Sequence, residues 1–309
     1  MHFWFLLFIA ISSSNAVAVS FDVDGNQISE LAVNSTKIRW RVLHFDNQED
    51  QKFNAVASLI MGGTGALLDM RVPGDNSISA KAYILTAAHV VEHLVPAKMQ
   101  AQAKADNHLT EFKPEQGYGL VTFQAMKGAR TVNGLNPHVY GHIKQIVLFS
   151  SKGADVALLE LVEPLEYFTA RGISPLRIAK TSPSYAQDVL LVGYLIPKVS
   201  LAASPGKSFE TAVFPIGDEF YKEGRDKLIK TDCCVYRGIS GSPILNPQTN
   251  EIVGVLVGTD STLPKAGAMN YYQPVWHLHD AFLNDGAFDL DAGIAKLNRC
   301  EQILNPELK

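Results

Sequence analysis

Short hydrophobic runs alternate with polar turns along the chain from about residue 38 onward. The runs are rich in valine, isoleucine, leucine and aromatic residues, and glycine, asparagine, aspartate and proline separate them. Runs of this kind between turn residues are typical of β-strands. The sequence therefore predicts strands that include 38–45, 53–61, 65–70, 119–124, 139–150, 189–195, 207–216, 229–235, 244–245 and 252–257.

Helical periodicity is much weaker than this strand pattern. The best helix candidate in the second half is 275–283, and 291–304 is a further candidate. Segment 164–173 is predicted to be the crossing between two halves of the chain. Many short strands with few helices favour β-barrels or a β-sandwich.

The first residues have the pattern of an export signal. Residues 3–11 are apolar, 12–15 are polar, and Ala16-Val17-Ala18 provides a small-x-small cleavage site. The apolar run is shorter than the roughly 20 residues that span a bilayer, so no stable membrane span is expected. We predict a signal peptide at 1–18 and a secreted or periplasmic protein of bacterial type, with a retained N-terminal anchor as the alternative.

The bulk composition is that of a soluble globular protein. The 309 residues are 47% hydrophobic and 19% charged, which leaves ample material for one large or two medium domains. The net charge of −4 provides no polybasic surface for nucleic acid or anionic lipid. We therefore expect no nucleic-acid partner.

Three cysteines are too few for a disulfide scaffold. Cys233 and Cys234 are adjacent, so on a strand their side chains point to opposite faces. One of them, with Cys233 the candidate, pairs with Cys300 in an oxidising compartment, or all three remain unpaired. The sequence leaves both alternatives open.

Three short blocks place a chemically active side chain at the end of an apolar strand. His89 follows one strand, Asp155 opens another, and Ser240 lies between Gly238 and Gly241 on a tight loop. Glycines beside a serine let the backbone approach a substrate carbonyl closely and turn amide N–H groups toward it. A glycine-rich turn alone is usually only a turn, so the other two blocks give this one its meaning.

Acyl transfer by a serine requires a hydroxyl, an imidazole and a carboxylate, and these three blocks supply one of each. Ser240 is the candidate nucleophile, His89 the base and Asp155 the group that orients the base. The backbone N–H groups of Gly238 and Ser240 are the candidate oxyanion hole. This chemistry needs no cofactor and no metal, and the sequence predicts neither.

The segments 86–89, 155–159 and 238–243 resemble the three signature blocks of chymotrypsin-fold (trypsin-like) serine proteases, in that family's His, Asp, Ser order. The resemblance implies an all-β fold of two Greek-key antiparallel β-barrels packed face to face with the active site between them, plus a C-terminal helix. It covers 38–285, with a first barrel at about 38–163 and a second at about 174–285. Residues 19–37 are then an N-terminal extension or short propeptide, and 286–309 a C-terminal extension.

Two departures from the family pattern affect regulation and specificity. Animal trypsin-like enzymes carry an aspartate before the nucleophile that pairs with a new N-terminus, whereas this chain has Ile239. The chain therefore resembles the bacterial, cysteine-poor branch that includes the glutamyl endopeptidases. By the resemblance the substrate pocket contains Cys234 at its base, with Val235, Leu256 and Thr259, which predicts a neutral pocket for small to medium apolar side chains.

The resulting prediction is an exported serine endopeptidase that acts on protein or peptide substrates as a monomer. The alternative is a protease-fold binding protein with impaired catalysis, in which the N–H groups of Gly238 and Ser240 do not converge. A nucleophile-elbow esterase is excluded, because its Gly-x-Ser-x-Gly motif would need glycine where this chain has Ser242.

Overall fold

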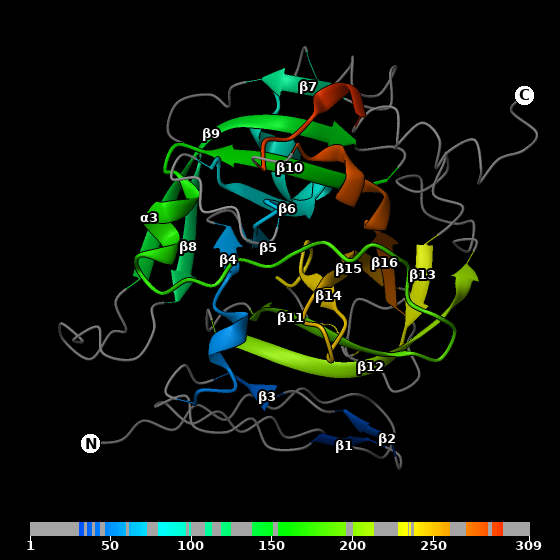
Figure 1. Ribbon diagram of the computed structural model, residues 1–309. Coiled ribbons are helices and arrows are strands. Elements are labelled where there is room, and N and C mark those ends of the chain that lie inside the picture. The colour runs from blue at the N-terminus through cyan, green and yellow to red at the C-terminus, as the bar shows by residue number, and fades with distance from the viewer. Residues whose placement is uncertain are drawn as a thin grey trace, which may run out of the picture.

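Two closed antiparallel β-barrels, one above the other in Figure 1, make up the computed structural model. The structure describes residues 31–33, 36–38, 41–43, 47–59, 62–72, 80–96, 99, 109–112, 119–124, 138–150, 154–195, 200–212, 228–233, 235, 238–259, 270–283 and 286–292. The predicted signal peptide and most of the second helix candidate, 291–304, lie outside these residues.

The first barrel closes because its two terminal strands pair with each other. The strand order around it is β10-β6-β5-β4-β8-β9, and β9 pairs again with β10. Strand β7 adds to β9 outside the closed ring. These strands are β4 (Val56–Leu59), β5 (Gly63–Leu68), β6 (Tyr83–Ala87), β7 (Leu109–Phe112), β8 (Leu120–Gln124), β9 (His138–Ser150) and β10 (Val156–Leu161).

The second barrel closes in the same way, in the order β11-β14-β15-β16-β13-β12 with β11 pairing to β12. Closure leaves a barrel without free strand edges. The all-β fold of two barrels is therefore confirmed. The strands are β11 (Asp188–Leu195), β12 (Ser200–Ala212), β13 (Leu228–Thr231), β14 (Pro243–Leu245), β15 (Ile252–Thr259) and β16 (Asn270–Pro274).

Helices in the described part of the chain are short. They are η1 (Gln51–Phe53), α1 (Ala88–Val91), η2 (Glu92–Leu94), α3 (Leu165–Thr169) and η4 (Trp276–Ala281). The helix predicted at 275–283 is thus a 3₁₀-helix, η4, which follows directly after β16. Among the described residues, no helix has the length and apolar character needed to cross a membrane.

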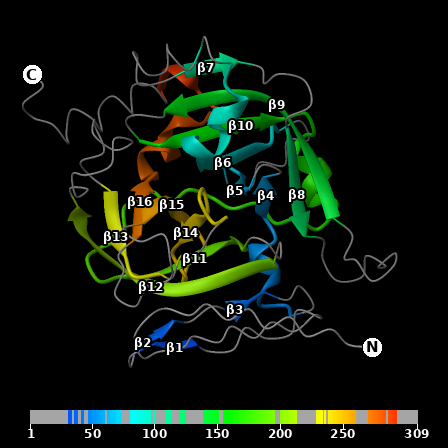
Figure 2. The same ribbon diagram turned by 180° about the vertical axis from the view of Figure 1, so that it is seen from behind.

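The N-terminal part of the domain contacts both barrels. Strand β3 (Arg41–Val42) lies in the range expected for the first barrel, yet it pairs with β12 of the second, which the rear view in Figure 2 shows. A small pair of strands, β1 (Leu31–Val33) and β2 (Thr36–Ile38), lies close to it. After η1 the chain enters β4 of the first barrel. Local hydrophobic pattern does not encode which barrel such a short strand joins.

Side chains on either side of η1 fasten this segment, which we call the N-terminal clasp (residues 41–43 and 47–54). The buried carboxylate of Asp50 forms an ion pair with Arg41. Asn54 is fully buried, donates from Nδ2 to the carbonyl of Gly172 at 2.7 Å and accepts the N–H of Ser174 at 2.8 Å. The clasp therefore joins the second barrel, the first barrel and the segment that connects them.

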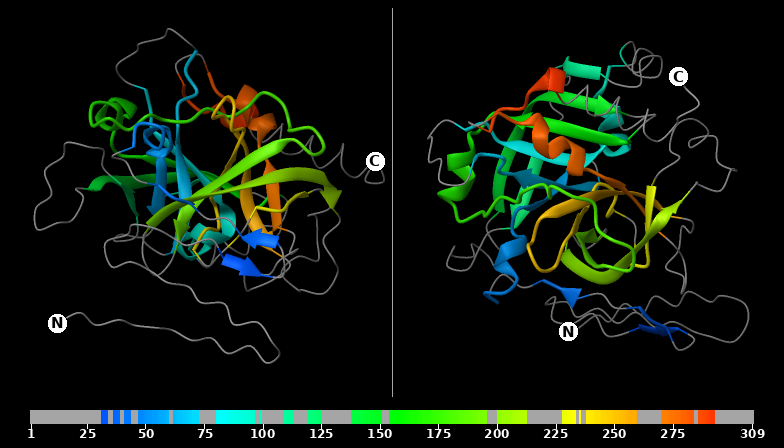
Figure 3. Two further views of the ribbon diagram at one scale, coloured as in Figure 1. Left: turned by 90° about the horizontal axis from the view of Figure 1, so that it is seen from below. Right: turned by 45° about the vertical axis from the view of Figure 1, so that its right-hand side comes forward.

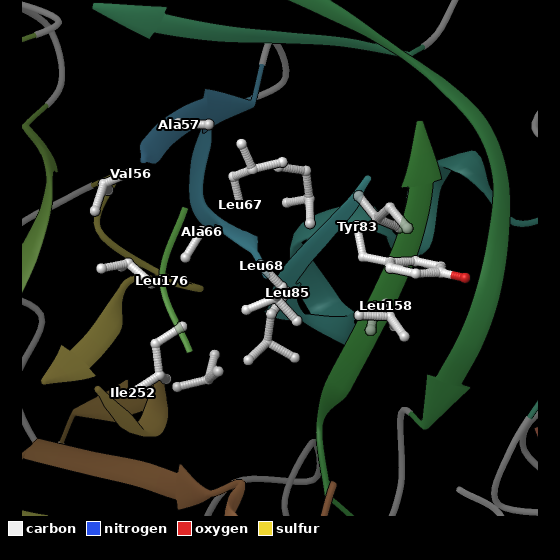
Figure 4. Close-up of a cluster of buried hydrophobic side chains, with 14 of the residues drawn as sticks. Val56, Ala57, Ala66, Leu67, Leu68, Tyr83, Leu85, Leu158, Leu176 and Ile252 are labelled. Carbon is white, nitrogen blue, oxygen red and sulfur yellow. The ribbon is translucent and has the colours of Figure 1, made fainter. Parts of the chain in front are cut away.

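The connection between the barrels also belongs to the core. The N–H of Leu176 donates to the carbonyl of Leu67, near the end of β5, at 2.8 Å. The carbonyl of Leu176 in turn accepts the N–H of Asp69 at 2.8 Å. Farther along, Ile252 of β15 donates to the carbonyl of Arg177 at 2.7 Å. Figure 4 shows Leu176 and Ile252 beside the buried side chains of β5, so one hydrophobic cluster runs through both barrels.

The chain after β16 returns to the first barrel. The ring of Phe282 packs edge-on against Tyr83 of β6 with centroids 5.8 Å apart, and the Tyr83 hydroxyl accepts the N–H of Phe288 at 3.0 Å. In the right panel of Figure 3 this orange and red segment lies against the first barrel. The two ends of the described domain thus each cross from one barrel to the other.

Glu160 is a buried carboxylate on β10. Its oxygens accept hydrogen bonds from Lys144 at 2.7 Å and Gln145 at 2.8 Å, and Lys81 lies at 3.5 Å. Burial by itself would raise the pKa of Glu160, but the hydrogen bonds and the two lysine charges together hold it below its usual value. A depressed pKa means that the ionised carboxylate stabilises the fold above its unfolded-state pKa.

We expect Glu160→Gln to lower the Tm at about pH 7, because the neutral amide loses the attraction of the two lysine charges. The loss is only about 2–5 °C, because both lysines are half-exposed and solvent screens this attraction. The wild-type advantage is fully present above the unfolded-state pKa of glutamate, near 4.3, and is lost as the pH falls through the lower folded-state pKa. Thermal unfolding of both proteins at several pH values checks this. The series runs from about pH 3, below the unfolded-state pKa, to about pH 7, above it. A Tm difference that grows on acidification contradicts it.

Candidate active site

His89 lies where a buried strand turns into a helix. Strand β6 ends at Ala87, and α1 begins at Ala88, with His89 as its second residue. The two alanines are buried and small, so the backbone can turn tightly against β10. The His89 side chain is 33% exposed, and a partly open imidazole can exchange protons with a bound molecule.

The carboxylate of Asp155 is fully buried and uses both oxygens on His89. Oδ2 lies 2.8 Å from Nδ1 of the ring, and Oδ1 accepts the backbone N–H of His89 at 2.9 Å. An ionised carboxylate only accepts hydrogen bonds, so Nδ1 carries the proton and the lone pair is on Nε2. The pair therefore presents a basic nitrogen on the side of the ring away from Asp155.

Strand pairing brings these two residues together. Strands β6 and β10 are antiparallel with Ala87 opposite Val156, so the residues just beyond each strand end meet. The N–H of Ala88 donates to the carbonyl of Asp155 at 3.0 Å. Asp155 has a φ of +50°, a left-handed conformation that aspartate tolerates better than most residues. Strained backbone of this kind is commonly held at functional positions.

The loop of residues 238–242, which we call the serine loop, is anchored to β15 on one side. The N–H of Gly241 donates to the carbonyl of Leu256 at 2.9 Å, and the N–H of Leu256 donates to the carbonyl of Ser242 at 2.9 Å. Ile239 is buried in the apolar cluster of the second barrel. A turn closed by Ser242 N–H donating to the Ile239 carbonyl at 2.9 Å gives the loop its shape.

The other side of the serine loop packs on the first barrel. The N–H of Thr64 in β5 donates to the carbonyl of Ser240 at 2.9 Å. Gly241 fits so closely that a Cβ there would lie 2.2 Å from Oγ1 of Thr86 and 3.1 Å from the nitrogen of Ala87. Ser240 is therefore half-buried at the junction of the barrels, beside the strand that leads to His89.

Two amide groups of the serine loop are the candidate oxyanion-hole donors. Within the part of the chain that the structure describes, the N–H groups of Gly238 and Ser240 donate to no other group. Gly238 has a φ of +98°, which glycine adopts without strain. Ser242, in contrast, is fully buried, and a Cβ on Gly193 would lie 2.0 Å from its hydroxyl, so it packs against β11.

The predicted pocket residues lie on strands next to the serine loop. Leu256 is buried in the same apolar cluster as Ile239, and Val235 and Thr259 are half-buried. Cys234 lies outside the described residues, so its place at the pocket base stays a prediction. Cys233 is fully buried, and Cys300 is not described either, so their pairing also stays a prediction.

Sequence reasoning missed three polar residues beside this region. Asn270 pairs with Thr259 across β15 and β16 and donates from Nδ2 to the carbonyl of Cys233 at 2.5 Å. The hydroxyls of Tyr272 and Ser208 are 2.9 Å apart and buried. Strand pairing alone brings these residues to this part of the second barrel. In the sequence, the one local sign of them was the position of Asn270 at the start of an aromatic run. Burial raises the pKa of Tyr272, which therefore stays protonated.

The described residues contain no group of three or more His, Cys, Asp or Glu side chains that could hold a metal ion. The arrangement provides an oriented imidazole, a serine on a loop that packs against the strand leading to that imidazole, and two amide groups on that loop that donate to no described residue. These are the groups that acyl transfer through a serine uses.

One family model and several solved structures are similar to this chain. A model of the trypsin-like peptidase domain matches residues 63–255, more than half of the chain. No curated protein matches the sequence. Among solved structures, the chain is similar to an inactive form of Rv3671c from M. tuberculosis H37Rv, with 16% identity over 82% of this chain and 93% of that one and a TM-score of 0.44. It is also similar to the HtrA-type protease AlgW with a decapeptide, with 14% identity over 69% and 48% and a TM-score of 0.41.

Because Gly241 packs closely against β5 and β6, we expect Gly241→Ala to lower the free energy of unfolding strongly. Gly286→Ala is the matched control. Their φ values are +81° and +80°, so each change costs roughly 1–2 kcal/mol of backbone strain. A Cβ on Gly286 meets the side chain of Arg71, whereas one on Gly241 meets Thr86 Oγ1 and the Thr64 carbonyl oxygen. Overpacking should therefore add about 1–3 kcal/mol at Gly241. Denaturant unfolding measures both, and equal losses would refute the close packing.

Proposed function

Because this chain belongs to the trypsin-like peptidase family, we propose that it is an exported serine endopeptidase that uses Ser240, His89 and Asp155. The observation that carries the proposal is the buried Asp155 carboxylate, which holds both the ring and the backbone N–H of His89. Two hydrogen bonds from one residue to one carboxylate fix both the tautomer and the direction of the imidazole. A merely structural histidine needs no such restraint.

In the acylation step, Nε2 of His89 takes the proton of the Ser240 hydroxyl while Oγ bonds to the carbonyl carbon of the substrate. The carbonyl π electrons move to its oxygen, which becomes an oxyanion that the N–H groups of Gly238 and Ser240 stabilise. Each such donor contributes about 2.7–4 kcal/mol to the transition state. The carbon–nitrogen bond then breaks, and His89 returns the proton to the leaving amine.

Deacylation repeats these steps with water. His89 removes a proton from water, the oxygen attacks the acyl-enzyme carbonyl, and Ser240 Oγ leaves with the proton that His89 returns. In both steps the imidazole becomes positively charged, and the ionised Asp155 stabilises that charge. Because Asp155 is fully buried, water does not compete for its oxygens.

The proposal also covers export of the protein and the branch of the family to which it belongs. The segment 1–18 supports export, and the apolar Ile239 beside the nucleophile supports a bacterial, cysteine-poor branch that resembles the glutamyl endopeptidases. The histidine that this branch uses to bind a glutamate side chain is Leu256 here. We therefore propose a different specificity within that branch, for small to medium apolar side chains, which the burial of Leu256 in the apolar cluster supports.

A radiolabelled organophosphonate should attach covalently to Ser240 in the native protein. Ser240→Ala should abolish labelling, whereas Ser242→Ala should preserve it, because the Ser242 hydroxyl is buried. Asp155→Asn should label about 10³–10⁴-fold more slowly, because the amide favours the wrong tautomer of His89. Mass spectrometry of the labelled peptide checks the attachment site.

A wild-type protein that binds peptides but takes no label would sink the endopeptidase proposal. That result would favour the catalytically impaired binding protein instead.

Incubation with a random peptide library, followed by sequencing of the products, tests the pocket. Cleavage should follow small to medium apolar residues, and Leu256→His should shift it toward glutamate, because the imidazole provides a partner for a carboxylate. Cleavage mainly after Lys, Arg or Glu in the wild type would contradict the proposed specificity.

A further inference from the structure

Thr64 of β5 lies at the point where the serine loop meets both barrels. It is fully buried, and its three polar atoms make four hydrogen bonds. The backbone N–H donates to the Ser240 carbonyl at 2.9 Å, and the Thr64 carbonyl accepts the hydroxyl of Thr86 at 2.7 Å. Nothing in its local sequence, apart from the flanking glycines, marks it for this role.

The direction of the hydroxyl hydrogen bonds follows from their partners. The N–H of Tyr194 in β11 lies 3.1 Å from Oγ1 and can only donate. The carbonyl oxygen of Gly238 lies 3.3 Å from Oγ1 and can only accept. A threonine hydroxyl has one proton, so Oγ1 accepts the N–H of Tyr194 and donates its own proton to the Gly238 carbonyl. Although long, this contact is the donor hydrogen bond of a hydroxyl whose side chain is fully buried.

The carbonyl of Gly238 occupies a sensitive place. It belongs to the peptide unit between Gly238 and Ile239, which lies between the two units that carry the N–H groups of Gly238 and Ser240. Rotation of this middle unit changes the angle between those two N–H groups. Because glycine adopts many backbone conformations, the Gly238 side of the unit has little restraint of its own.

We infer that the Thr64 hydroxyl is a positioning group, which holds the Gly238 carbonyl so that both oxyanion-hole N–H groups aim at one point. The inference rests on the proposed peptidase function. Ile239 anchors the same peptide unit from the other side by burying its side chain in the second barrel. One polar contact from the first barrel and one apolar contact from the second thus hold the peptide unit between Gly238 and Ile239.

Threonine suits this task because its branched Cβ restricts χ1 and keeps the hydroxyl in one direction. The glycines on either side of Thr64 in β5 also pack closely against their neighbours. A Cβ on Gly63 would lie 2.2 Å from Val90, the residue after His89, and one on Gly65 would lie 2.6 Å from Ile84. Strand β5 therefore holds the serine loop and contacts the helix of the base at the same time.

The test compares the full chain with Thr64→Val, Thr64→Ala, Thr64→Ser and Ile146→Val. Valine and alanine remove the hydroxyl, and alanine is the second variant should the extra methyl of valine prevent folding. Serine restores the hydroxyl. Ile146→Val is a control for lost stability, because this fully buried residue lies on β9, away from the serine loop.

With a substrate from the library, Thr64→Val and Thr64→Ala should lower kcat about 10–100-fold, less than the roughly 10²–10³-fold loss of a whole oxyanion donor. KM should change less than about 2-fold, because the lost contact acts in the transition state. The pH dependence of kcat/KM should keep its midpoint, since His89 and Asp155 are untouched. Thr64→Ser should recover activity to within about 3-fold, and Ile146→Val should match wild type.

Hydrogen–deuterium exchange of peptides that cover the serine loop gives a readout independent of activity. Exchange should be faster in the valine and alanine variants than in the serine variant and the Ile146→Val control. Unchanged loop exchange, or an unchanged kcat in folded Thr64→Val or Thr64→Ala, overturns the inference. If wild type takes no phosphonate label, the peptidase proposal fails, and the exchange data still decide whether Thr64 holds the loop.

Discussion

The antiparallel pairing of β6 with β10 is the constraint on which the site depends. It sets Ala87 opposite Val156, so the turn into α1 and the first residue before β10 must meet. A slip of one residue would place every side chain of a strand on its opposite face, and Asp155 would lose His89. Closure of the barrel through β9 and β10 makes such a slip costly, because every neighbouring strand would have to follow it.

The site is shared between two units, neither of which contains all of it. His89 and Asp155 come from the first barrel and Ser240 from the second. Their relation is set by contacts that cross the junction: the serine loop on β5 and β6, the connecting segment between β5 and β15, and the returning chain at Tyr83. The geometry of such a candidate site is only as rigid as the packing between the barrels, so residues distant from the three side chains contribute to it.

Much of the fold could be predicted from the sequence, and the structure brings two of the predicted site residues, His89 and Asp155, into contact. Short apolar runs bounded by turn residues identify strands directly, and His89, Asp155 and Ser240 each lie in a recognisable block at a strand end. Partner choice between strands was not predictable, because the period of a strand says which face is buried and not which neighbour it pairs with. For this reason β3 was expected in the first barrel, and the contacts of Thr64 with the serine loop and of Asn270 with Cys233 were not foreseen. The segment 275–283 was correctly seen as helical, but periodicity over so few residues does not distinguish an α-helix from a 3₁₀-helix.

The N-terminal clasp is a segment where one backbone cut would loosen both barrels. A cut between Arg41 and Asn54 separates β3 from β12 or frees the connecting segment from Asn54. A single break in this segment would therefore weaken the contact between the barrels, on which the candidate site depends.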